Sequence, residues 1–167
     1  MAFALKTLSK ESIPQALERV ERYRLLNEPR VAESICLDVL EVDAEHQQAL
    51  VMLVLSLSDQ FDDGAGGGAD RRALELVPRL QREYDRFYYT GIIHERQARA
   101  RLRRGYPGAG FDAYELYRKA MDFFERADRL QPGAGEDAVL RWNCCARALA
   151  QNDLQPRPRS EHEAPLE

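Results

Sequence analysis

Apolar residues recur at steps of three and four along most of this chain, which is the spacing of amphipathic helices. The spacing predicts seven helices, at about residues 13–26, 29–40, 45–59, 70–83, 85–104, 112–130 and 136–151. No stretch of alternating β-branched residues bounded by turn residues marks a strand. The pattern therefore predicts an all-α protein.

Glycine and proline divide these helices. Pro78 lies inside the fourth predicted helix and should bend or break it near Val77, because proline lacks the N–H that a helix interior needs. The glycine-rich stretch 62–70 predicts a flexible loop and matches no phosphate-binding loop motif. Residues 152–167 contain three prolines and few apolar residues. We therefore expect a helical domain over 1–151 and a disordered tail over 152–167.

The helices also form a repeat, because pairs of them recur at intervals of about 34 residues. In the clearest unit, the first helix carries Phe87, Thr90, Gly91 and His94, and the second carries Ala120, Phe124, Ala127 and Pro132. This pattern resembles the tetratricopeptide repeat family. The resemblance covers about residues 13–151 and implies an α-solenoid of antiparallel helix pairs, with three units and a closing helix. The long loops at 62–70 and 105–112 depart from the family's tight turns.

The same resemblance implies a concave groove lined by the first helix of each pair, which in that family holds a peptide or a helix. The register places these residues on it: Leu17, Glu18, Glu21, Arg24, Val51, Met52, Leu55, Asp59, Tyr88, Tyr89, Ile92, Glu95, Arg96, Asn143, Cys144 and Arg147. From this set we predict a partner-binding site made of Met52, Leu55, Tyr88, Tyr89, Ile92, Arg96, Asn143 and Arg147. The alternative is that Tyr88, Tyr89 and Met52 pack against one another or under the glycine-rich loop.

One kind of tetratricopeptide groove is excluded by its residues. Members that bind chaperones hold a C-terminal carboxylate with a clamp of lysine, asparagine and arginine. The corresponding positions here are Leu17, Glu21, Met52, Asp85 and Tyr89, none of which is a clamp residue. Asn143 and Arg147 lie one turn apart and could still anchor a single polar group.

Charge is unevenly distributed along the chain and leaves two other functions open. The net charge is −4, yet residues 71–104 carry ten arginines against four acids. Arg96, Arg99 and Arg103 share one helix face and could contact phosphates of a nucleic acid or an acidic protein partner. The simpler interpretation is that these arginines pair with acids of neighbouring helices. Self-association is the third possibility, since the first 63 residues are acidic.

Catalytic and metal-binding patterns are missing from the sequence. The stretch "HERQA" has Ala98 where a zinc-protease helix needs its second histidine, so His94 is interpreted as a packing residue. The three cysteines have no zinc-site spacing, and the adjacent Cys144 and Cys145 are interpreted as small apolar fillers. We therefore expect a protein without enzymatic activity, cofactor or metal.

The hydropathy of the chain indicates where in the cell we expect the protein. The longest apolar run, 49–57, is interrupted by Ser56 and is too short to span a bilayer. The first residues lack the basic start and the long apolar stretch of a signal peptide. We therefore expect a cytoplasmic protein that does not enter a membrane.

Overall fold

The computed structural model describes residues 3–62, 68–131 and 135–158, and in these ranges it is all helical, with no strand. The seven α-helices are α1 (Ile13–Leu25), α2 (Pro29–Val42), α3 (Gln47–Ser58), α4 (Ala69–Leu76), α5 (Glu83–Arg104), α6 (Ala109–Leu130) and α7 (Asp137–Gln151). Two short 3-10 helices, Lys10–Ser12 and Val77–Arg79, precede α1 and follow α4. The all-α prediction and its seven helices are therefore confirmed.

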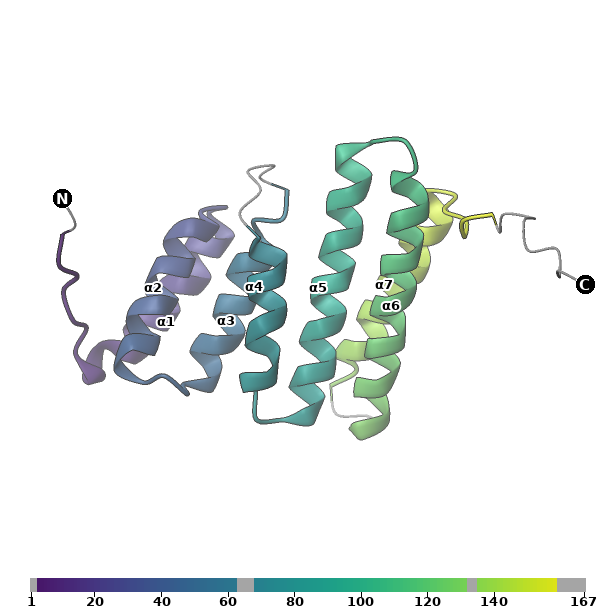
Figure 1. Ribbon diagram of the computed structural model, residues 1–167. Coiled ribbons are helices and arrows are strands. Elements are labelled where there is room, and N and C mark those ends of the chain that lie inside the picture. Colours follow the sequence, from purple (N-terminus) through teal and green to yellow (C-terminus); the bar gives the residue numbers. More distant parts are fainter. Residues whose placement is uncertain (1–2, 63–67, 132–134, 159–167) are drawn as a thin grey trace, which may run out of the picture.

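The helices follow one another across the molecule in chain order, and each lies beside its neighbours in the sequence (Figure 1). The longest two, α5 and α6, pack against each other along their lengths and are joined by the short connection 105–108. Gly105 and Gly108 in this connection have positive φ angles of 62° and 89°, a backbone region that favours glycine.

Local sequence explains where several helices begin and end. Pro29 occupies the first turn of α2, where its missing N–H is not needed. His46 caps α3 because its ring Nδ1 accepts a hydrogen bond of 3.3 Å from the backbone N–H of Ala49. α4 ends at Leu76, and Pro78 lies in the 3-10 turn that follows. The predicted break near Val77 is thus confirmed.

Apolar side chains form two clusters along the row of helices. The first is built mainly from α1 to α4 and the second mainly from α5, α6 and α7. Tyr89 on α5 packs against both, whereas Leu55 on α3 packs against the second. The two clusters therefore meet where α5 passes α3 and α4.

The chain continues past α7 along a defined path to residue 158. Leu154 packs against the second cluster, and Arg157 forms an ion pair of 2.8 Å with Asp112 of α6 while its guanidinium lies 5.3 Å from the ring centroid of Phe111. Residues 152–158 thus have specific contacts, although the sequence predicted disorder from residue 152. The low apolar content of the segment did not indicate these contacts, because they depend on one leucine and one arginine. The predicted disorder of 159–167 and most of the glycine-rich loop fall outside the described residues.

Candidate functional site

A cavity of about 700 Å³ lies between the C-terminal parts of α1, α3 and α5. We call it the arginine cavity, because Arg24, Arg96, Arg99 and Arg103 line it together with Glu21, Asp59 and Asp62. The helical register of the repeat predicted that one groove contains Glu21, Arg24, Asp59 and Arg96. The structure brings these four residues together, because α3 contacts both α1 and α5.

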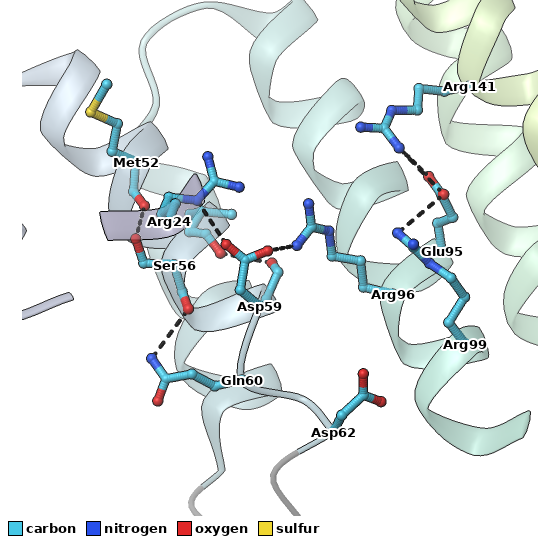
Figure 2. Close-up of polar contacts among 12 residues, drawn as sticks. Arg24, Met52, Ser56, Asp59, Gln60, Asp62, Glu95, Arg96, Arg99 and Arg141 are labelled. Atoms are coloured by element: carbon cyan, nitrogen blue, oxygen red, sulfur yellow. Dashed lines mark hydrogen bonds and ion pairs between the residues drawn. The ribbon is translucent and has the colours of Figure 1, made fainter. Parts of the chain in front are cut away.

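Asp59 joins three helices at the floor of this cavity (Figure 2). It follows the last residue of α3, and its Oδ2 accepts a hydrogen bond of 2.7 Å from Nε of Arg24 on α1. Its Oδ1 accepts a hydrogen bond from Nη1 of Arg96 on α5. All three side chains are only about a fifth exposed. One carboxylate therefore compensates two partly buried guanidinium groups.

A second carboxylate, that of Glu95, also contacts two arginines (Figure 2). Glu95 lies on α5, one residue before Arg96. Its side chain is only 6% exposed and lies between Arg99 of α5, at 3.5 Å, and Arg141 of α7, at 3.4 Å. A buried carboxylate needs such partners, because an uncompensated charge in a protein interior is costly. Here too one acid serves two arginines.

Arg96 is the most constrained of the cavity arginines. Its Nε–H is buried and finds no acceptor among the described residues. Burial lowers the pKa of Arg96 to about 10, and repulsion from Arg99, Arg24 and Arg141 acts in the same direction. Its guanidinium remains protonated at neutral pH, so a largely buried positive charge lines the cavity.

Arg99 and Arg103 lie further along α5 and are more exposed, at 42% and 63% of their side chains. Arg103 forms an ion pair with Asp62, which follows α3. Steps of three and four residues separate Arg96, Arg99 and Arg103, so the three side chains share one face of the helix. Their shared face was predicted from the sequence.

The aromatic part of the predicted site lies on the N-terminal half of α5. The rings of Tyr84 and Tyr88 stack with centroids 5.7 Å apart, and Tyr88 meets Tyr89 edge-on at 5.2 Å. Tyr88 also lies 5.8 Å from the ring of Phe124 on α6. Burial raises the pKa of Tyr89 to about 12. The tyrosines therefore pack against one another, as the alternative interpretation expected, and leave only part of each ring exposed.

The eight predicted site residues do not form one exposed surface. Met52 and Ile92 are 6% and 1% exposed and belong to the two apolar clusters, so in this conformation neither can offer a surface to a partner. Leu55, Tyr88 and Tyr89 are half-buried, Arg96 lies in the arginine cavity, Asn143 is half-buried and Arg147 is exposed on α7. The prediction missed Arg24, Asp59, Asp62 and Arg141 as functional candidates. Register had signalled two of these, Arg24 and Asp59, as groove positions.

Most arginines of the basic segment 71–104 have partners within the chain. Ion pairs join Arg71 to Glu75, Arg72 to Glu33, Arg79 to Glu45 and Arg82 to Asp85. Arg86 donates to the carbonyls of Leu80 and Gln81, and Arg104 donates to that of Phe61. These contacts agree with the interpretation that the arginines pair within the chain. They argue against a continuous phosphate-binding stripe.

The other chemistry-bearing residues lie in packed positions. His94 contacts Gln97 at 2.9 Å and lies 5.6 Å from the ring of Phe123, and burial lowers its pKa. Cys36 and Cys145 are buried, and burial raises the pKa of each thiol to about 12. Cys144 is exposed, so its interpretation as an apolar filler is wrong. Within the described ranges, no three acid, histidine or cysteine side chains gather as a metal site.

None of the described helices combines the length and the apolar character needed to cross a bilayer. Comparison of the chain with protein-family models, with curated proteins and with solved structures found no match in any of the three.

Proposed function

We propose that this chain is a non-enzymatic interaction module of tetratricopeptide-like architecture. It binds an acidic segment of a partner protein on the surface formed by α1, α3, α5 and α7. The observation that carries the proposal is the charge of the arginine cavity. Four arginines, Arg24, Arg96, Arg99 and Arg103, line it against three acids, Glu21, Asp59 and Asp62.

The shape and composition of this surface support a protein partner. The half-buried tyrosines of α5 supply rigid aromatic area next to the arginines, and tyrosine and arginine dominate binding energy at interfaces. Guanidinium forks match carboxylates in two-point hydrogen bonds, which gives acidic side chains an advantage over neutral ones. The revised contact surface consists of Leu55, Tyr88, Tyr89, Arg96, Arg99 and Arg103, without the buried Met52 and Ile92.

The experiment is the selection of binders from a random peptide library displayed on phage, with the purified protein immobilised. We expect the wild type to enrich peptides rich in Asp and Glu. The double variant Arg99→Glu, Arg103→Glu should lose this enrichment, and the selected peptides should bind it at least about tenfold more weakly, because two attractive charges become repulsive.

The matched control is the double variant Arg71→Glu, Arg129→Glu. It makes the same change in net charge at two exposed arginines, on α4 and α6, each of which forms an ion pair with a glutamate one turn away. We expect it to retain the enrichment. If both double variants lose binding equally, the attraction is due to overall charge and the arginine cavity is not the binding surface. Enrichment of peptides without acidic residues would also contradict the proposal.

A further inference from the structure

We propose that the arginine cavity is a subsite for a single oxyanion, a phosphate or a carboxylate group, which Arg96, Arg99 and Arg103 hold together. The inference rests on the proposed function, since the oxyanion would belong to the bound segment. It adds to it the chemical class of the group that enters the cavity.

The first argument is the sharing of acids between arginines. Asp59 bridges Arg24 and Arg96, and Glu95 bridges Arg99 and Arg141, so each of these carboxylates compensates two cations. The lining of the cavity itself has four arginines against three acids, Asp59, Asp62 and Glu21, and the Glu21 residue is exposed. A guest anion is therefore attracted to this cavity by uncompensated positive charge.

The second argument is the hydrogen-bonding capacity of Arg96. Its side chain lines the cavity, and its Nε–H is buried from solvent and lacks an acceptor among the described residues. Buried donors in proteins are nearly always paired, so an unpaired one needs an explanation. Because this atom is shielded from solvent in the unbound structure, a guest oxyanion can become its acceptor only when the Arg96 side chain turns toward the cavity on binding. The guest would also relieve the repulsion between Arg96 and the neighbouring Arg99 and Arg24.

The third argument is the graded exposure along α5. Arg96 is 17% exposed at the base, Arg99 is 42% exposed above it and Arg103 is 63% exposed at the rim. The deep arginine is paired with Asp59, whereas the two outer side chains can turn more freely toward a guest. A deep cation with two adjustable donors suits a group with several oxygens. Arg99 must leave Glu95 and Arg103 must leave Asp62 to take part, which selects for a strongly charged guest over a neutral one.

The two sources of the oxyanion can be separated by titration. The probes are inorganic phosphate and acetate, each added to the whole protein at constant ionic strength and followed by isothermal titration calorimetry. We expect saturable phosphate binding that weakens as falling pH converts the phosphate dianion to the monoanion. If acetate binds as tightly as phosphate, the subsite serves carboxylates, and an acidic side chain is its natural guest.

The test variant is Arg99→Gln, Arg103→Gln, and the control is Arg71→Gln, Arg129→Gln. All four side chains are substantially exposed, so both variants should fold, which circular dichroism checks. We expect phosphate affinity to fall at least about tenfold in the first variant and to stay unchanged in the second. Equal loss in both, or no saturable binding of either anion to the wild type, overturns the inference.

The outcome separates this inference from the proposed function. If library peptides bind the wild type through Arg99 and Arg103 but neither anion competes with them, the interaction module stands and the oxyanion subsite is wrong. If an anion binds in the cavity but no acidic peptide is enriched, the subsite stands and the proposed peptide binding is wrong.

Discussion

At the scale of the residue, Gly91 shows how sequence pattern becomes packing. It lies within α5 opposite Phe124 of α6, which is fully buried. A methyl group added at Gly91 would come within 2.6 Å of the Phe124 ring, closer than real Cβ contacts allow. Both residues had been identified as positions of the repeat pattern, small in one helix and aromatic in the other. The contact gives that pattern a steric reason.

The substitution Gly91→Ala should therefore destabilise the protein, although alanine favours helix formation by about 1 kcal/mol over glycine. Overpacking a core costs typically about 1–3 kcal/mol, and the buried Phe124 ring has little room to move. We expect a net loss of about 1–2 kcal/mol in the free energy of unfolding, measured by urea denaturation.

Gly110→Ala is the matched control for this prediction. Gly110 lies in the first turn of α6, and the nearest atom to an added methyl group is a Leu154 methyl carbon at 3.7 Å, an ordinary contact. We expect this variant to be as stable as the wild type or slightly more stable. A Gly91→Ala protein that unfolds at the wild-type urea concentration would show that the α5–α6 contact is looser than the structure has it.

At the scale of the element, α1, α3 and α5 are tied together by the carboxylate of Asp59 as well as by apolar contacts. The substitution Asp59→Asn keeps the size of the side chain and removes its charge. It leaves Arg24 and Arg96 without their shared anion in a site where each side chain is about four-fifths buried. Helix packing here depends on a polar bridge that local sequence does not reveal.

We expect Asp59→Asn to lower the free energy of unfolding by about 2 kcal/mol, somewhat less than the 3–5 kcal/mol reported for fully buried pairs. Thermal and urea denaturation measure this loss. The control is Glu75→Gln, which breaks the exposed pair with Arg71 and should change stability by no more than about 0.5 kcal/mol. Similar effects of the two variants would mean that Asp59 is solvated and does not bridge the helices.

The helices could be predicted closely from the sequence because apolar spacing, proline and glycine act locally. α1, α5 and α7 begin and end within two residues of their predicted bounds, and Pro78 marked the end of α4. α6 begins three residues before its predicted start, since Gly108 already allows the chain to turn into the helix. α4 ends earlier than predicted because Pro78 interrupts the helix.

At the scale of the whole molecule, the sequence could predict which residues belong to one groove but not which of them stay accessible. Register assigned Met52, Ile92, Arg24 and Asp59 to the same groove. The structure buries the first two in the apolar clusters and places the other two in the arginine cavity. Exposure depends on how closely α3 and α5 approach each other, and helical periodicity carries no information on that distance. The contact of Arg141 with Glu95 likewise joins residues 46 positions apart.

The most direct measurement of the binding surface is a titration of isotope-labelled protein with hexaglutamate, followed through backbone amide NMR shifts. We expect the shifts to concentrate at the C-terminal ends of α1, α3 and α5, around Arg24, Asp59 and residues 96–104, and to disappear in the Arg99→Glu, Arg103→Glu variant. Shifts spread over α2, α4 and α6, or centred on residues 71–82, would contradict binding in the arginine cavity.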